Sequence, residues 1–183
     1  MRITGGELKG LHVPDTKLNL RPTTNKAKQA LFNILNNRIQ WETCDALELF
    51  AGTGSISFEL ASRGAKTITA VDLDRQNCKL IRQNADSLKL PLIRTVHADA
   101  VTFLRNTKEK WSLIIADPPY NYRHYELLVK LIFEKHLLRE DGLLVVEHSR
   151  RTNFGALPFF TEQRKYGEVN FSFFDEKDRA GTV

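Results

Sequence analysis

The stretch DALELFAGTGS, residues 45–55, joins a short apolar run to two glycines and leads into a segment of helical period. From there to residue 147, apolar runs alternate with helical segments, which is typical of a parallel sheet with crossover helices. The predicted strands cover residues 45–50, 67–71, 92–96, 111–116 and 142–147, and the predicted helices cover residues 52–63, 74–88, 100–106 and 125–136. Two further segments, residues 162–166 and 168–174, have the pattern of antiparallel edge strands. We therefore predict an α/β protein with a Rossmann-like, mostly parallel, doubly wound sheet.

The composition is that of one ordinary soluble domain with a basic appendage. The 183 residues are 42% hydrophobic and 27% charged, which excludes a wholly disordered chain, a collagen-like sequence and a disulfide scaffold. The net charge is +5, and residues 1–42 contribute +4 of it through seven basic and three acidic side chains. We predict an appendage over residues 1–42, whose helix covers residues 25–37, a larger domain over residues 43–177 and a tail over residues 178–183.

Cysteine usage and hydropathy favour a reducing compartment. The two cysteines, Cys44 and Cys78, form no Cys-x-x-Cys pair, and no histidine run completes a metal shell. We interpret both as reduced core thiols and expect no metal. The start of the chain lacks the apolar run of a signal peptide, and no stretch approaches 18 continuous apolar residues. We expect a cytoplasmic protein that is a monomer and does not enter a membrane.

The glycine turn after the first predicted strand is a candidate ligand site. Its members are Phe50, Ala51, Gly52, Thr53 and Gly54. Glycines let a ligand approach the backbone closely, although a strand-to-helix turn also uses glycine for its own geometry. A dinucleotide fingerprint requires a third glycine where this chain has Ser57. NAD and FAD are therefore disfavoured, and a nucleoside-containing ligand without a pyrophosphate remains.

Acidic residues follow the second and third predicted strands. Asp72, with Leu73 after it, stands where a carboxylate accepts hydrogen bonds from the two hydroxyls of a ribose. Asp99, with Ala100 after it, has the matching place for an adenine amino group. The alternative for each acid is that it caps the helix that follows. We count all four residues as candidate cofactor contacts.

The most specific motif is Asp117-Pro118-Pro119-Tyr120, directly after the fourth predicted strand. The two prolines lack N–H groups and have fixed φ angles, so they stiffen the loop and leave carbonyls for other partners. Asp117 and the Pro118 carbonyl can accept the two hydrogens of a planar exocyclic amine, while Tyr120 stacks on the base. The alternative is a rigid surface turn that carries a tyrosine. The position at the carboxyl edge of a doubly wound sheet favours the ligand-binding interpretation.

These motifs resemble a known family. The Asp-Pro-Pro-Tyr loop and the Gly-x-Gly turn, in this order, resemble the S-adenosylmethionine-dependent amino methyltransferases that act on nucleic-acid bases. The segments RITGG at residues 2–6, KG at 9–10, LRPT at 20–23 and ALFN at 30–33 resemble the opening of the bacterial 16S ribosomal RNA guanine-N2 methyltransferases. The resemblance runs from residue 2 to about residue 175.

The resemblance implies a class I methyltransferase fold and a reaction. S-adenosylmethionine would donate a methyl group to the N2 amine of a guanine, with S-adenosylhomocysteine as product and 16S rRNA or the small ribosomal subunit as partner. Glu48 would lie near the amino group of the cofactor, Asp72 at its ribose and Asp99 at its adenine. Thr23, beside Arg21, belongs to a segment that would fold over the cofactor. Asp117 would position the amine rather than deprotonate it, because an ordinary aspartate is a weak base.

The sequence departs from the family at two places. Phe50 stands where many class I methyltransferases have their first glycine, and its ring would close over the cofactor. Between residues 24 and 30 the family usually has an acid, two arginines and a glutamate, whereas this chain has Asn25, Lys26, Lys28 and Gln29.

The excess positive charge suggests an RNA surface. We predict phosphate contacts from Lys9, Arg21, Lys26 and Lys28 in the appendage and from Arg123 after the Asp-Pro-Pro-Tyr loop. The alternative is an ordinary solvated surface. Two other functions remain open at this point. The same chemistry could act on an adenine or cytosine of DNA or on another RNA, and a Rossmann-like scaffold could bind nucleic acid without catalysis.

Overall fold

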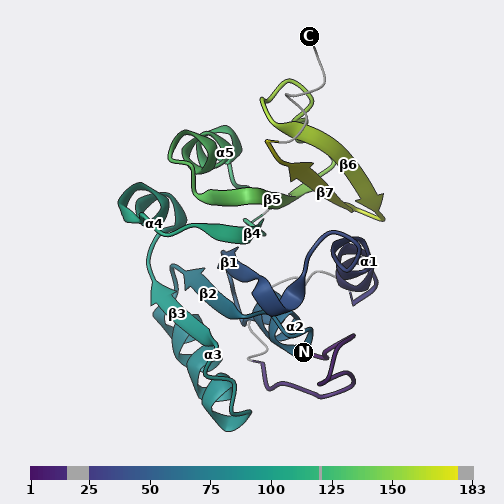
Figure 1. Ribbon diagram of the computed structural model, residues 1–183, viewed down its shortest axis with the longest axis vertical. Helices are drawn as coiled ribbons and strands as arrows, with labels where there is room; N and C mark the ends of the chain where they lie inside the picture. Colours follow the sequence, from purple (N-terminus) through teal and green to yellow (C-terminus); the bar gives the residue numbers. More distant parts are fainter. Residues whose placement is uncertain (16–24, 120, 177–183) are drawn as a thin grey trace.

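The computed structural model describes residues 1–15, 25–119 and 121–176 (Figure 1). One seven-stranded sheet has the order β3-β2-β1-β4-β5-β7-β6. The first five strands in the chain pair in parallel, and β7 pairs antiparallel with both β5 and β6. The strands are β1 Asp45–Leu49, β2 Thr67–Asp72, β3 Ile93–His97, β4 Trp111–Ala116, β5 Leu138–Ser149, β6 Phe160–Tyr166 and β7 Val169–Phe174. The predicted fold class is confirmed.

Helices cover both faces of the sheet. They are α1 Asn25–Leu35, α2 Ser55–Ser62, α3 Arg75–Ser87, α4 Ala100–Asn106 and α5 Tyr125–Glu134, and a 3-10 turn, η1, covers Trp41–Thr43. In Figure 1, α1, α2 and α3 lie on one face and α4 and α5 on the other. Each face has its own core, with Leu31, Phe58 and Ile81 in the first and Leu104, Leu128 and Ile132 in the second. No helix in the described part of the chain is long and apolar enough to span a bilayer.

The predicted elements are all present, with shifted ends that have local causes. The helix predicted from residue 52 begins at Ser55, because Gly54 has a left-handed φ of 82° and caps it. The strand predicted from residue 142 begins at Leu138, where the chain pairs with Trp111 before a shift in register. The helix predicted to end at residue 136 ends at Glu134, and His136 has a φ of 51°.

The N-terminal segment packs along α2. Its two arms are joined by the Arg2–His12 bridge and by the hydrogen bond from Ile3 N to Leu11 O at 3.0 Å. The tip between them contacts the last residue of α2, because Glu7 N donates to Ser62 O at 2.7 Å and Leu8 N donates to Ser62 Oγ at 2.9 Å. The N-terminal segment is thus attached to the rest of the fold through polar contacts and through the buried side chains of Ile3 and Val13, which belong to the same apolar core as Phe58.

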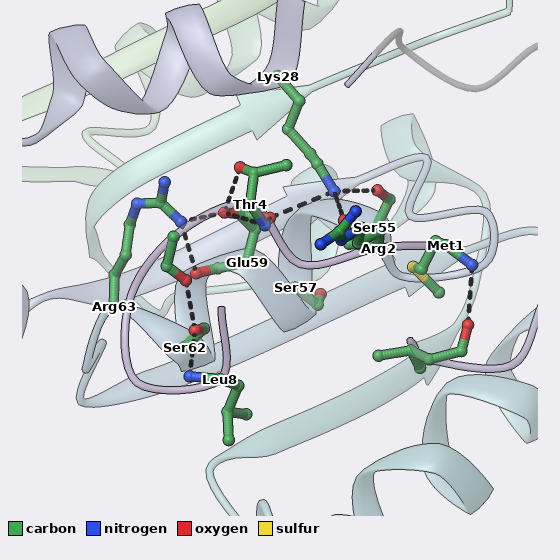
Figure 2. A network of polar contacts seen from close by, with 12 residues as sticks. Met1, Arg2, Thr4, Leu8, Lys28, Ser55, Ser57, Glu59, Ser62 and Arg63 are labelled. Atoms are coloured by element: carbon green, nitrogen blue, oxygen red, sulfur yellow. Dashed lines mark hydrogen bonds and ion pairs between the residues drawn. The ribbon is translucent and has the colours of Figure 1, made fainter. Parts of the chain in front are cut away.

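A buried ion cluster connects this segment, α1 and α2 (Figure 2). The Lys28 side chain is 1% exposed, and its ammonium donates to Arg2 O and Ser55 Oγ, each at 3.0 Å. The same Nζ lies 3.2 Å from Glu59 Oε2. The Glu59 carboxylate is fully buried, accepts hydrogen bonds from Thr4 N and Thr4 Oγ, and pairs with Arg63. Burial alone would raise the pKa of Glu59, but the hydrogen bonds from Thr4 and Arg63 and the charge of Lys28 lower it below its usual value.

This cluster contradicts the expectation that Lys28 contacts RNA. An ammonium that is surrounded by the protein and has three partners has no access to a phosphate. The charge of Lys28 instead compensates that of Glu59 in the interior, where an unpaired charge is strongly unfavourable.

We predict that Glu59→Ala lowers the free energy of unfolding by about 3–5 kcal/mol, because it leaves the Lys28 ammonium buried without its anion. Urea denaturation measures the change. The matched control is Glu134→Ala, which removes the partner of Lys130 in a pair whose side chains are 65% and 61% exposed, and it should change stability by less than about 1 kcal/mol. Equal changes in the free energy of unfolding for the two substitutions would show that the buried cluster does not stabilise the fold.

Candidate functional site

The ends of four parallel strands meet at one edge of the sheet. β1 lies between β2 and β4, and all three run in the same direction. The chain passes from β1 to β2 on one side and later returns to β4 on the other, so the helices that follow these strands cover opposite faces. Sheets of this kind bind ligands in the crevice at such a switch point. The glycine turn, Asp72, Asp99 and the Asp117 loop all follow strand ends at this edge.

The glycine turn has a backbone that most residues avoid. Gly54 has a φ of 82°, and a Cβ there would come within 2.8 Å of Ile81 Cγ1. Gly52 has a φ of 54°. Phe50 has a φ of 62°, in the left-handed region where related enzymes are expected to have glycine. The alternative interpretation of the glycines therefore holds in part, because the turn needs them for its own geometry.

Asp72 fixes the glycine turn to β2. Its side chain accepts hydrogen bonds from Gly52 N at 2.7 Å, from Asp74 N at 2.8 Å and from Asn77 Nδ2 at 3.1 Å. The cap of α3 is Asp74, which accepts from Gln76 N, so Asp72 is not itself the capping residue. The carboxylate thus holds the backbone of the turn at a set distance from the end of β2.

Asp99 and Leu73 are open to solvent at the same edge. Asp99 is exposed and caps α4 through its bond to Thr102 N at 2.8 Å, as the alternative interpretation held. A capping carboxylate still has lone pairs for a ligand. The Leu73 side chain is 70% exposed, an unusual position for a large apolar residue in this fold. His97 Nε2 lies 3.0 Å from Leu73 O and ties the ends of β2 and β3 together.

Glu48 lies beneath the turn and is 3% exposed. It accepts hydrogen bonds from Ser57 N at 2.9 Å and from Ser57 Oγ. The pKa of Glu48 is raised to about 8, chiefly by burial and also by the charges of Asp117 and Asp72, while the Ser57 bonds partly oppose the increase. A serine at the third fingerprint position therefore has a structural reason, since its hydroxyl and N–H satisfy a buried carboxyl group.

The Asp-Pro-Pro loop continues from β4 beside the glycine turn. Asp117 N donates to Leu49 O at 3.3 Å, which joins the loop to the end of β1. Asp117 is half-buried, Pro118 is buried and Pro119 is exposed. The Pro119 carbonyl accepts from Tyr122 N at 2.8 Å, so this carbonyl closes the turn. Tyr120 lies outside the described residues.

Tyr122 is a residue of this loop that our sequence analysis did not select. Its ring meets Phe50 at a centroid distance of 5.1 Å and Tyr125 at 5.2 Å, both edge to face. Its hydroxyl oxygen is buried and has no hydrogen-bond partner among the described residues. The sequence feature that could have pointed to Tyr122 is its position as an aromatic residue two places after Tyr120.

The predicted RNA residues are separated in space. Lys26 is exposed in the first turn of α1, close in sequence to Lys28, whose ammonium reaches Ser55 at the glycine turn. Arg123 is exposed after the Asp-Pro-Pro loop. Lys9 is exposed but follows the residues that contact Ser62, at the end of α2 remote from the glycine turn. Arg21 and Thr23 lie outside the described residues. In the described ranges no three His, Cys, Asp or Glu side chains are placed to hold a metal ion.

Comparisons with solved structures define the class of fold. A putative methyltransferase from Escherichia coli superposes with a TM-score of 0.82 and 28% identity, over 95% of this chain and 96% of that one. A hypothetical protein of Thermus thermophilus superposes with a TM-score of 0.84 and 27% identity, over 96% and 99% of the two chains. The sheet order, the antiparallel edge and this likeness are those of the Rossmann-like methyltransferases.

The family follows from sequence comparisons. Ribosomal RNA small subunit methyltransferase D of Escherichia coli K12 is 31% identical over 160 residues, 86% of this chain and 79% of that protein. Putative rRNA methyltransferase YlbH of Bacillus subtilis is 32% identical over 186 residues, 97% of this chain and all of that protein. The chain belongs to the family of ribosomal RNA small subunit methyltransferase D, whose model, described as Conserved hypothetical protein 95, matches residues 1–175. The resemblance inferred from the motifs is confirmed.

We predict that Glu48 makes the cofactor-free protein lose stability with rising pH. The folded pKa of about 8 lies above the ordinary value of 4.5, so this stabilising contribution is complete below pH 4.5 and is lost as pH rises through 8. Each pKa unit corresponds to about 1.4 kcal/mol, so the loss amounts to a few kcal/mol.

Urea denaturation at a series of pH values checks this prediction. Glu48→Gln should remove the decline between about pH 5 and pH 8.5, whereas the control Glu140→Gln, at an exposed position, should follow the wild type. A Glu48→Gln profile parallel to the wild-type profile would mean that the carboxyl group is ionised throughout.

Proposed function

We propose that the protein transfers a methyl group from S-adenosylmethionine to the N2 amine of a guanine in 16S rRNA, leaving S-adenosylhomocysteine. The observation that carries the proposal is the junction of the Asp117 loop with the glycine turn, through the hydrogen bond from Asp117 N to Leu49 O. This junction supports the proposal because the loop proposed to bind an amine lies beside the turn proposed to bind a nucleoside. The family supports the rRNA substrate, since the Escherichia coli relative is named for the small ribosomal subunit.

The residues at the sheet edge fit an adenosine-containing cofactor. The exposed Leu73 side chain offers an apolar surface to a purine ring, and the exposed Asp99 carboxylate offers an acceptor to its amino group. Asp72 stands at the end of β2, where a carboxylate can reach a ribose. When bound, S-adenosylmethionine supplies a methyl group on a positively charged sulfonium. The buried Glu48 supports the glycine turn through its bond from Ser57 N, and its proposed place near the amino group of the cofactor stays a prediction.

Asp117 and the Pro118 carbonyl are proposed to position the amine of the target base. The N2 lone pair of guanine is delocalised into the ring and is a poor nucleophile. Hydrogen bonds from its two N–H groups to these acceptors favour a pyramidal nitrogen whose lone pair faces the methyl group. The N2–carbon bond forms as the sulfur–carbon bond breaks, and one N2 proton then passes to solvent. Tyr120 is the proposed stacking partner of the base.

Positioning is expected to supply more of the rate than base catalysis. Holding two reactants in line lowers a barrier by roughly 7–11 kcal/mol, whereas general-base catalysis of 10²- to 10⁴-fold corresponds to about 3–5 kcal/mol. The negative charge of Asp117 also stabilises the positive charge that develops on the nitrogen. The proposed role of Asp117 is therefore to orient the amine.

The target guanine has to be accessible to this loop. The N2 amine of a paired guanine is hydrogen-bonded, so the base must be unpaired or flipped out of its stack. Lys26 and Arg123 are exposed cations, one in the first turn of α1 and the other after the Asp-Pro-Pro loop. We propose that they contact the phosphates that flank the target.

The proposed function is tested by tritium-methyl transfer to small subunits and to naked 16S rRNA from a strain that lacks this gene. Digestion and mass analysis of the labelled nucleosides should give N2-methylguanosine. Label in N6-methyladenosine or in N4-methylcytidine would keep the chemistry and overturn the substrate. No transfer to either RNA, together with no binding of S-adenosylmethionine in calorimetry, would leave only a non-catalytic binder.

We predict that Asp117→Ala lowers single-turnover methylation by at least about 10²-fold and leaves the affinity for S-adenosylmethionine within about threefold of the wild type, because the carboxylate contacts the amine. Rapid-quench assays and calorimetry measure the two quantities. Asp86→Ala, at an exposed position on α3, is the control and should retain full turnover. Near-normal methylation by Asp117→Ala would disprove the positioning role.

We predict that Lys26→Gln combined with Arg123→Gln reduces the magnitude of the slope of log RNA affinity against log salt concentration by about 1.4–1.8. Each neutralised phosphate contributes about 0.7–0.9 to that slope. Filter binding over a range of salt concentrations measures the slope. The control combines Lys108→Gln with Lys110→Gln, two exposed lysines before β4 at the opposite edge of the sheet, and should keep the wild-type slope. Identical slopes for both double variants would place the RNA surface elsewhere.

A further inference from the structure

The hydroxyl group of Tyr122 lacks a partner although its ring is firmly held. The ring meets Phe50, Tyr125 and His124 edge to face at centroid distances of 5.1, 5.2 and 5.8 Å. The hydroxyl oxygen is out of contact with water, and no described residue hydrogen-bonds to it. An unsatisfied buried polar group destabilises a protein by about 1–3 kcal/mol. The orphaned hydroxyl therefore calls for an explanation that packing of the ring does not provide.

The neighbours of Tyr122 place this hydroxyl at the ligand-binding edge. Phe50 follows β1, Asp99 follows β3, and Tyr122 itself follows β4, so the three residues come after the carboxyl ends of three parallel strands of one sheet. Burial and, to a smaller extent, the negative charge of Asp99 raise the pKa of Tyr122 to about 12. The hydroxyl is therefore protonated at neutral pH and lies close enough to Asp99 to respond to its charge.

The proposed adenosine site offers hydrogen-bond acceptors and also needs a hydrogen-bond donor. The carboxylates of Asp72 and Asp99 only accept hydrogen bonds. Adenosine presents donors, at its amino group and its ribose hydroxyls, and acceptors, at its ring nitrogens. Specific recognition of an adenine needs a group of each kind, and a protonated tyrosine hydroxyl is a donor. Tyr122 is only partly buried as a residue, so its side chain borders the surface of the molecule at this edge.

We infer that the Tyr122 hydroxyl donates a hydrogen bond to a ring nitrogen of the cofactor's adenine while Asp99 accepts from the adenine amino group. This inference rests on the proposed function and adds a cofactor-binding residue to it. The donor has already lost its water in the cofactor-free protein, so its desolvation does not oppose binding. The pair would also discriminate adenine from guanine, whose 6-oxo group cannot donate to Asp99.

The first test compares Tyr122→Phe with the wild type in calorimetric titrations of the cofactor-free protein with S-adenosylhomocysteine. The dissociation constant should rise about five- to tenfold, as expected for one lost hydrogen bond. The thermal midpoint of the cofactor-free variant should stay equal or increase, because the removed oxygen had no partner. A merely structural hydroxyl would instead lower the midpoint. Tyr166→Phe, on β6, is the matched control and should leave the affinity unchanged.

The second test uses S-adenosylhomocysteine in which one adenine ring nitrogen, N1, N3 or N7, is replaced by carbon. The wild type should bind one of the three analogues about five- to tenfold more weakly than the parent, and Tyr122→Phe should bind that analogue and the parent equally. Equal affinity of variant and wild type for the parent compound would overturn the inference, as would equal sensitivity of both to every analogue. Failure of the wild type to bind S-adenosylhomocysteine would overturn the proposed function instead.

Discussion

The parallel pairing of β1 with β2 on one side and with β4 on the other is the constraint on which the site depends. Parallel strands end at the same edge, so the turns after β1, β2, β3 and β4 have to meet there. The helices that follow these strands cover opposite faces of the sheet, as Figure 1 shows. Residues that are far apart in the sequence, such as Asp72 and Asp117, come to the same edge of the sheet through this arrangement alone.

The groups at this edge support one another before any ligand is present. Asp72 holds the backbone of Gly52, Glu48 holds Ser57, and the Asp117 backbone is joined to Leu49. These contacts fix the turns in place, so little conformational entropy is lost when a ligand binds. The buried pair of Lys28 and Glu59 also holds the N-terminal segment against α2, the helix that begins at the glycine turn (Figure 2).

Much of the fold could be predicted from the sequence, because the period of the apolar residues depends on local geometry. The helix over residues 100–106 and the strand over residues 111–116 were predicted with their observed bounds. Side-chain partners were harder to predict, since they depend on residues brought together only in the folded chain. Lys28 has the sequence context of a surface lysine. Nothing nearby in the chain indicates that its side chain is buried and paired with Glu59.

The candidate site shows the same division. The sequence placed the acidic residues correctly near the strand ends. It did not predict that Asp72 accepts a hydrogen bond from Gly52 N or that Glu48 accepts one from Ser57 N. The orphaned hydroxyl of Tyr122 has no sequence signature, because the absence of a partner is a property of the packed structure. The base proposed as the target was inferred from the family resemblance, because base recognition depends on the geometry of a complex with RNA.

A crystal structure of the protein with S-adenosylhomocysteine tests the central claim, that this edge of the sheet is the cofactor site, most directly. The account predicts the ribose at Asp72, the adenine between Leu73 and Asp99, and the sulfur directed toward Asp117. Difference density for the ligand at the opposite edge of the sheet, or against the N-terminal segment, would contradict it.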